Sequence, residues 1–368
     1  MSELQQQIQK VVDELVASGA ERGVQVAVYQ DGEQVVDVVS GVADPATGRP
    51  VDPGTVFYNY SIGKAATSTV VHLLAERGLF GYDTPVAELW PEFAANGKQA
   101  VTLRQVLNHT AGVPGIPLDT TVEDLCDWDK MCAAIAGAEL WWEPGTKVGY
   151  HAYTFGYILG EVVRRVTGKR ISQVLLEDVA EPLGVAGELW FGMPAAEHHR
   201  LAPLEDEPGA AEMAAQMLAS MPPDLPMLRS APMALFPSAT FGNRPDTLAA
   251  DIPAGGKTSA RAIARLYAAL LGEVDGVRLL SPERLREVTA VSSSGTDEVF
   301  GMPTRWGLGY GIGLPDGTRD TAFGIGGVGG SFAFGDTASG LAFGLTKNRV
   351  SNDFATATRL TQLVTGAA

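Results

Sequence analysis

The sequence predicts an α+β protein whose antiparallel sheet is built from both ends of the chain and flanked by helices. Alternating apolar and polar residues, the pattern of strands, occur near the N-terminus and again near the C-terminus. Between these regions the chain shows mainly helical periodicity, interrupted by Pro and Gly turns. We therefore expect one α/β domain from residues 1–78 and 250–368, a mainly helical domain from residues 79–249, and a site at their interface.

The N-terminal part predicts a helix, a hairpin and a second helix, in that order. The stretch GVQVAVYQDGEQVVDVVSGVAD alternates around the turn Asp31-Gly32, which is typical of an antiparallel hairpin. A long apolar stripe then predicts a helix from about Ser61 to Gly78. The amphipathic helix that precedes the hairpin has one apolar face, formed by Ile8, Val11, Val12, Leu15 and Val16.

The middle and the end of the chain complete the prediction. Residues 205–253 are rich in Pro, Met and Ala, and they predict either a flap over a pocket or an ordinary surface loop. A helix is expected over Thr258–Glu273, with Thr258 or Ser259 as its N-cap, and a closing helix from about Asp353 to Val364. Four strands are expected between these two helices, in RWGLGYGIG, TAFGIGGV, SFAFGD and LAFGLTKNR.

Composition narrows the classes of function. The chain has 368 residues, of which 45% are hydrophobic and 19% charged, as in ordinary globular proteins. Its net charge of −16 repels phosphate backbones and anionic membranes, so neither nucleic acid nor a membrane is expected as a partner. The N-terminus lacks the pattern of a signal peptide, and no apolar stretch approaches the ~18 to 20 residues of a membrane span, which predicts a cytoplasmic protein. Since no histidine has zinc-ligand spacing, neither a metal nor another cofactor is expected.

Two glycine patterns resemble phosphate-binding loops, but the residues around them do not fit such a loop. FGIGGVGGS, Phe323–Ser331, contains the letters of a dinucleotide-binding loop, yet no helix is predicted to follow it. Gly256-Lys257-Thr258 resembles the end of a P-loop, but Asp251 stands where that motif needs glycine. A glycine-rich strand instead allows a ligand to approach the backbone closely, and we expect this of FGIGGVGGS.

The only S-x-x-K in the chain, Ser61-Ile62-Gly63-Lys64, is a candidate catalytic pair. Residues i and i+3 share a helix face, so the amine of Lys64 can reach the hydroxyl of Ser61. A desolvated lysine can act as a general base near neutral pH, and the start of a helix favours the alkoxide that develops on the serine. The motif alone is compatible with chance, because both residue types are common.

Tyr150 is the second candidate. It lies in EPGTKVGYHAYTFGYILGE, where a Pro-Gly turn leads into a predicted helix. A tyrosine at such a junction can relay a proton between a nucleophile and a leaving group. The alternative is that Tyr150 is a packing residue like its neighbours Tyr153, Phe155 and Tyr157.

In this order, Ser61-x-x-Lys64, Tyr150 and the Ile325-Gly326-Gly327 strand resemble the three motifs of the serine β-lactamase and penicillin-binding protein superfamily. The match is closest to class C β-lactamase-like esterases, the family VIII carboxylesterases, and it also includes LNHTAG and RWGLGYG. The resemblance implies a β-lactamase/DD-peptidase-like fold. It further implies that Ser61 is the acylated nucleophile, Lys64 its general base and Tyr150 the proton relay.

The same resemblance implies further roles around the nucleophile. The N–H groups of Ser61 and Val328 would form the oxyanion hole, and Ile325, Gly326, Gly327 and Trp306 would contact the substrate. The chain departs from the family at Ile325, where β-lactamases and DD-peptidases usually have lysine, and at Ala152, where the family places an asparagine. Without a cation at position 325, weak recognition of a substrate carboxylate is expected. Lys64 is then the only motif-derived cation near Tyr150, so a strongly lowered tyrosine pKa is not expected.

These observations predict a serine hydrolase that forms an acyl-Ser61 intermediate from a small neutral carboxylic ester. The alternative is an acyltransferase that passes the acyl group to an alcohol or an amine, and the sequence does not separate the two. A non-catalytic penicillin-binding-like module is the third possibility. No oligomeric state is predicted.

Overall fold

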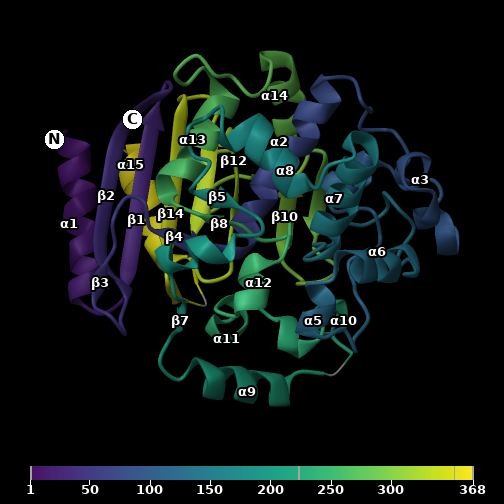
Figure 1. The fold of residues 1–368 in the computed structure, drawn as a ribbon, viewed down its shortest axis with the longest axis horizontal. Helices are drawn as coiled ribbons and strands as arrows, with labels where there is room; N and C mark the ends of the chain where they lie inside the picture. The colour runs from purple at the N-terminus through teal and green to yellow at the C-terminus, as the bar shows by residue number, and fades with distance from the viewer. Residues whose placement is uncertain (1, 223, 352, 367–368) are drawn as a thin grey trace.

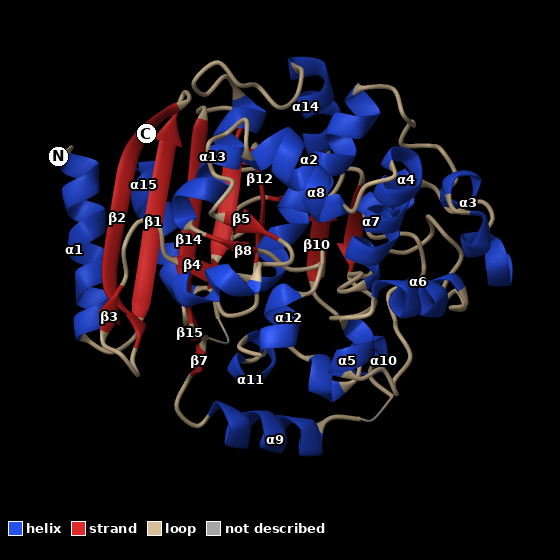
Figure 2. Ribbon diagram, in the orientation of Figure 1, coloured by secondary structure: helices blue, strands red, loops and turns tan. Residues whose placement is uncertain are grey.

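A nine-stranded antiparallel sheet forms one side of the molecule in the computed structural model, which describes residues 2–222, 224–351 and 353–366 (Figure 2). Its strands are β1 (Gly23–Gln30), β2 (Glu33–Asp44), β3 (Arg49–Pro50), β9 (Ser293–Thr296), β10 (Pro303–Trp306), β11 (Gly311–Ile312), β12 (Ala322–Gly326), β13 (Phe332–Asp336) and β14 (Leu341–Lys347). The strand order is β3-β2-β1-β14-β13-β12-β11-β10-β9. The sheet thus joins the two ends of the chain.

The junction between β1 and β14 brings the two ends together. Val24 pairs with Lys347 and Gln30 with Leu341 in an antiparallel register, and in Figure 1 the purple β1 lies beside the yellow β14. In the turn of the β1–β2 hairpin, Asp31 and Gly32 have φ values of 50° and 86°, as a type I′ turn requires. The predicted α+β fold with a sheet from both termini is confirmed.

Helices cover both faces of this sheet. α1 (Glu3–Ala17) and α15 (Ala355–Gly366) pack on one face, and α13 (Ala260–Leu271) packs on the other (Figure 1). The side chains of Val26 and Ala27, neighbours in β1, therefore enter different apolar clusters. β1 is buried at nearly every position because neither face of the strand meets water.

Twelve further helices complete the described part of the fold, and most of them lie on the other side of the molecule (Figure 2). They are α2 (Gly63–Glu76), α3 (Val86–Leu89), α4 (Leu103–Leu107), α5 (Val122–Leu125), α6 (Trp128–Ala136), α7 (Thr154–Thr167), α8 (Ile171–Leu175), α9 (Ala210–Ser220), α10 (Pro226–Ser230), α11 (Ala239–Gly242), α12 (Pro245–Ala249) and α14 (Pro282–Thr289). Short 3₁₀ and π turns are η1 (Tyr60–Ile62), η2 (Pro91–Gly97), η3 (Leu176–Ala180), η4 (Ala195–Arg200) and η5 (Met233–Leu235). Within the described residues, no helix combines the length and apolar character needed to cross a bilayer.

Two small sheets connect the nine-stranded sheet to the helices. One has the order β5-β8-β4-β6, and the other pairs β7 with β15. Their strands are β4 (Val56–Tyr58), β5 (Leu189–Trp190), β6 (Leu201–Ala202), β7 (Glu205–Asp206), β8 (Lys257–Thr258) and β15 (Arg349–Val350). β4 leads directly into η1 and α2, so this small sheet holds the segment around Ser61.

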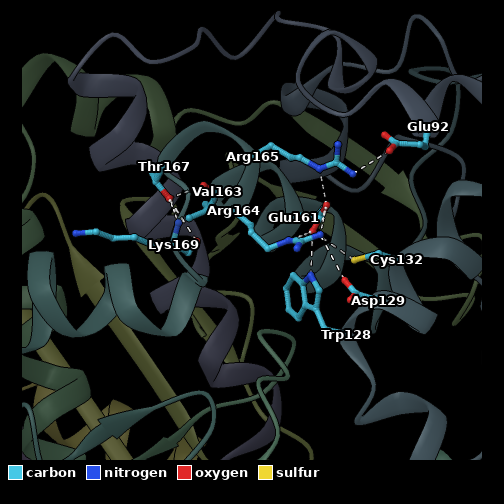
Figure 3. Close-up of polar contacts among 10 residues, drawn as sticks. All are labelled: Glu92, Trp128, Asp129, Cys132, Glu161, Val163, Arg164, Arg165, Thr167 and Lys169. Carbon is cyan, nitrogen blue, oxygen red and sulfur yellow. Dashed lines mark hydrogen bonds and ion pairs between the residues drawn. The ribbon is translucent and has the colours of Figure 1, made fainter.

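A buried carboxylate organises the helices around α7. The carboxylate of Glu161 accepts hydrogen bonds from Arg164, Arg165 and Trp128, at 2.7–2.9 Å (Figure 3). Burial raises the pKa of Glu161, but these hydrogen bonds outweigh it and lower the pKa overall. Because Trp128 belongs to α6 and Arg165 also binds Glu92 of η2, the network fixes α7, the helix that follows Tyr150.

Three predicted elements differ in detail. α13 begins at Ala260 with Ser259 as its N-cap, because Lys257 and Thr258 form strand β8 instead. RWGLGYGIG is interrupted between β10 and β11, since the N–H groups of Leu308 and Gly309 bind carbonyls outside the sheet. Residues 205–253 contain β7, η5 and four of the helices, α9 to α12, and none of their described residues lines the cavity described below.

Candidate active site

Ser61 lies in η1, at the sharp turn between β4 and α2. Tyr60 precedes it with φ of 47°, a conformation that non-glycine residues rarely adopt and that is often found at functional sites. Gly63 begins α2 against the backbone of Gly255 and Gly256, where an added Cβ would meet atoms at 2.3 Å. Glycine at position 63 therefore allows the loop before β8 to reach the base of the turn.

Lys64 is buried directly behind Ser61. Its Nζ lies 3.2 Å from Ser61 Oγ and 3.0 Å from the carbonyl oxygen of Ala254, and only 1% of the residue is exposed. No carboxylate of the described residues forms an ion pair with this amine. Burial lowers the pKa of Lys64 to about 7, so a large fraction of the amine is neutral at physiological pH.

Tyr150 approaches Ser61 from the other side, with its hydroxyl 2.8 Å from Ser61 Oγ. Its ring lies 4.9 Å below Lys64 Nζ, and it stacks on Trp306 at 5.7 Å between centroids. Burial raises the pKa of Tyr150, and the nearby carboxylate of Asp297 adds to this shift, while the hydrogen bond with Ser61 opposes it. The phenol is therefore neutral near pH 7 and donates to the serine oxygen.

The third predicted motif lies at the end of β12. Ile325 and Gly326 pair with Ala333 and Phe332 of β13, and both contribute to the wall of the cavity in front of Ser61. Gly327 is absent from that wall among the described residues. It packs on the backbone of Asn59 instead, where an added Cβ would lie 2.0 Å from the carbonyl oxygen.

Val328 follows in the turn after β12. Its side chain is 46% exposed and belongs to the cavity wall. Within the described part of the chain, no carbonyl or side chain accepts a hydrogen bond from its N–H. Val328 and Ser61 line the same cavity, so this N–H is a candidate donor to a ligand there.

The cavity in front of Ser61 has a volume of about 560 Å³, which is in the range of pockets for small molecules. Apolar and aromatic side chains form much of its wall, among them Phe300, Met302, Trp306, Leu314, Ile325 and Phe354. Asp297 and Asp353 also line it, whereas no lysine or arginine of the described residues does. The cavity therefore suits neutral or cationic molecules better than anions.

Two buried residues that the sequence did not single out hold Tyr150 in place. The carboxylate of Asp297 accepts hydrogen bonds from the N–H groups of Tyr150, Val299 and Phe300, at 2.8–2.9 Å. His109, in the LNHTAG stretch, has its ring centroid 4.8 Å from that of Tyr150 and 4.4 Å from that of Trp306. Burial lowers the pKa of His109 well below its usual range, so the ring is neutral. The LNHTAG stretch contains His109 and could have identified it from the sequence, whereas no local motif contains Asp297.

The chain is similar to a known family and to several known proteins. A family model described as Beta-lactamase matches residues 8–366. The chain is 38% identical over 336 residues to Esterase/beta-lactamase LipL of Mycobacterium tuberculosis (strain ATCC 25618 / H37Rv), covering 88% of this chain and 76% of that protein. It is 30% identical over 193 residues to Esterase EstB of Burkholderia gladioli, covering 48% of each.

Solved structures agree with the sequence comparisons. A family VIII carboxylesterase superposes with a TM-score of 0.88 at 34% identity, covering 100% of this chain and 98% of the other. A penicillin-binding protein homolog from Caulobacter crescentus superposes with a TM-score of 0.86 at 32% identity and the same coverage. Together with a family match along almost the whole sequence, these similarities show that the chain belongs to the β-lactamase family and is a β-lactamase-like serine hydrolase.

Proposed function

We propose that the protein hydrolyses small neutral carboxylic esters through an acyl-enzyme on Ser61. The observation that carries the proposal is the convergence of Lys64 Nζ and the Tyr150 hydroxyl on Ser61 Oγ, at 3.2 Å and 2.8 Å, beside an apolar cavity. A nucleophile within hydrogen-bond reach of a base and an acid is the arrangement that acyl transfer needs.

In the first half-reaction, neutral Lys64 takes the proton of Ser61 as Oγ attacks the ester carbonyl. The negative charge that develops on the carbonyl oxygen is stabilised by the N–H groups of Ser61 and Val328. When the C–O bond to the alcohol breaks, Tyr150 donates its proton to the leaving oxygen. The ammonium of Lys64, which lies over the Tyr150 ring, stabilises the phenolate and returns a proton to it.

In the second half-reaction, water replaces the alcohol at the acyl carbon. Lys64, neutral again, accepts one proton as the water attacks, either directly or through the Tyr150 hydroxyl, which takes the proton of the water and passes its own on, and the same two N–H groups stabilise the second tetrahedral intermediate. Collapse of this intermediate releases the carboxylic acid and returns a proton to Ser61 Oγ. The raised pKa of Tyr150 supports its role as a proton donor in the resting enzyme, with Lys64 as the group that begins catalysis.

The preference for a neutral ester follows from the cavity wall. Ile325 is apolar where related β-lactam-binding enzymes carry a cation, and the charged residues of the described wall, Asp297 and Asp353, are both acidic. An anionic substrate would enter without a partner for its charge. A neutral acyl group instead gains from contact with the aromatic side chains.

A labelling experiment tests the proposal. A fluorophosphonate probe is expected to modify Ser61, and p-nitrophenyl acetate is expected to be hydrolysed by the wild type and not by Ser61→Ala. A cephalosporin with a free carboxylate is expected to be a much poorer substrate. Equal hydrolysis of the ester by Ser61→Ala would overturn the nucleophile, and efficient cephalosporin turnover would overturn the argument from Ile325.

Adding an alcohol or an amine to the same assay separates hydrolysis from acyl transfer. A hydrolase is expected to release the free acid as its main product whether or not an acceptor is present. If the added acceptor captures most of the acyl group, the second half-reaction written above is wrong.

A further inference from the structure

The turn that carries Val328 has few restraints of its own. It spans residues 327–330 and is closed by hydrogen bonds from Gly330 N to Gly327 O, at 3.1 Å, and from Gly327 N to Ser331 O, at 2.9 Å. Gly329 and Gly330 have φ values of 98° and 88°, which favour glycine. A turn with three glycines and one exposed valine needs support from outside to hold one N–H in a fixed direction.

Ser351, which follows β15, supplies that support. Its backbone N–H and its hydroxyl both face the carbonyl oxygen of Gly329, at 3.3 Å and 3.1 Å. The Ser351 side chain is buried and also lines the cavity in front of Ser61. A second contact follows the turn in the sequence, where the Ser331 hydroxyl donates to Asn59 Oδ1 at 2.9 Å.

A buried ion pair orients the Ser351 hydroxyl. Lys347 Nζ lies 2.8 Å from Ser351 Oγ and 2.6 Å from Glu21 Oε1. The ammonium donates to Oγ, so the hydroxyl proton is left for a carbonyl, and Gly329 O is closer to it than Asp353 O. Lys347 ends β14 and Glu21 precedes β1, so both termini of the chain contribute to this arrangement.

The ion pair between Lys347 and Glu21 is expected to add little to the stability of the fold. The side chains of Lys347 and Glu21 are each 2% exposed, and the desolvation of two such charges often cancels their attraction. Thr356 of α15 also donates to Glu21 Oε1, at 2.6 Å, while Glu21 Oε2 has no hydrogen-bond partner among the described residues. An apolar pair of similar size could pack here at comparable stability, but it could not direct the hydroxyl of Ser351.

We propose that Ser351, oriented by the Lys347–Glu21 pair, is a positioning residue for the oxyanion hole. By holding the Gly329 carbonyl it fixes the turn, and with it the direction of the Val328 N–H. This inference rests on the proposed function, because it assigns the Val328 N–H to the transition state. A misdirected donor weakens the transition state more than substrate binding, so kcat should fall while KM changes little.

Steady-state kinetics of Ser351→Ala on p-nitrophenyl acetate test the proposal. The expected result is a kcat about tenfold or more below the wild type with KM within about twofold, since loss of one oxyanion donor costs on the order of 10²–10³ in kcat. Ser339→Ala is the matched control. Ser339 bonds to Asp336 in the β13–β14 turn, and this substitution should leave both constants unchanged.

A second variant, Glu21→Met/Lys347→Met, separates orientation from folding. It should keep a melting temperature close to that of the wild type and show a similar loss of kcat, and adding Ser351→Ala to it should cost little more, because the residues act as one unit. Full kcat in either the serine variant or the double variant would overturn the inference. Turnover that survives Ser61→Ala would overturn the proposed function as well, so the two failures are distinguishable.

Discussion

Two buried lysines, Lys64 and Lys257, have similarly lowered pKa values and different neighbours. Burial lowers the pKa of each to about 7, and each ammonium lies over a tyrosine ring, at 4.9 Å for Lys64 and 4.6 Å for Lys257. Lys64 contacts the hydroxyl of Ser61 at the cavity. Lys257 donates to the carbonyls of Phe191 and Thr247 and, among the described residues, contributes nothing to the cavity wall.

The comparison shows that a shifted pKa marks desolvation rather than catalysis. Both amines lost their water on folding, and both would give up a proton near neutral pH. Only Lys64 faces a hydroxyl that a substrate can reach, so only Lys64 has a reaction to promote. The sequence already favours Lys64, which lies in the only S-x-x-K of the chain, whereas Gly256-Lys257-Thr258 resembles the end of a phosphate-binding loop.

Replacing each lysine by methionine is expected to give the largest difference in kcat between the two sites. Lys64→Met is expected to lower kcat on p-nitrophenyl acetate by about 10³-fold, the middle of the range for a lost general base. Lys257→Met should leave kcat within about threefold, because Lys257 donates to two backbone carbonyls, lies over the Tyr58 ring and is not among the described residues that line the cavity. Equal losses in the two variants would show that burial, and not contact with Ser61, decides the effect.

Tyr150→Phe tests the group that protonates the leaving oxygen. It removes the hydroxyl 2.8 Å from Ser61 Oγ and keeps the ring under Lys64, and kcat is expected to fall by about 100-fold. The loss should shrink with esters of more acidic alcohols, which leave without a proton. A near-normal rate with an ester of a simple alkyl alcohol would show that another group protonates the leaving oxygen.

The pH dependence of kcat/KM tests which of the two lysines controls the rate. Lys64 acts as a base only when neutral, and its pKa is lowered to about 7. The rate constant should therefore rise with pH and level off above pH 7, being about tenfold below the plateau at pH 6. Lys257→Met is expected to keep this profile unchanged. If the profile shifts in Lys257→Met, the ionisation that controls the rate belongs to Lys257 and not to Lys64.

The last prediction concerns the pH dependence of stability rather than of activity. The pKa of Lys257 is about 7 in the folded protein and 10.5 in its unperturbed state, so between these values the unfolded chain binds more protons and the free energy of unfolding rises with pH. The slope from one such lysine approaches about 1.4 kcal/mol per pH unit. Denaturant unfolding at pH 7 to 10 should show a smaller rise in Lys257→Met than in the wild type. Identical slopes would mean that Lys257 is not desolvated.

Local patterns predicted the parts of the molecule that depend on near neighbours. Ser61 and Lys64 are three residues apart at the start of a helix, so their contact follows from helix geometry. The hairpin turn at Asp31-Gly32 and the amphipathic face of α1 also follow from short-range rules. The predicted elements are less accurate where distant residues determine the backbone path. In RWGLGYGIG, carbonyls outside the sheet accept hydrogen bonds from the N–H groups of Leu308 and Gly309, and the predicted strand is interrupted there.

The sequence by itself determined the fold class, the candidate nucleophile and its base, because periodicity and helix spacing are properties of adjacent residues. Tertiary packing was needed to desolvate both lysines and to bring Tyr150, 89 residues away in the sequence, to within 2.8 Å of Ser61 Oγ. It also placed Asp297 under the backbone of Tyr150 and Ser351 beside the turn of Val328. These contacts join segments far apart in the sequence, so no local pattern encodes them.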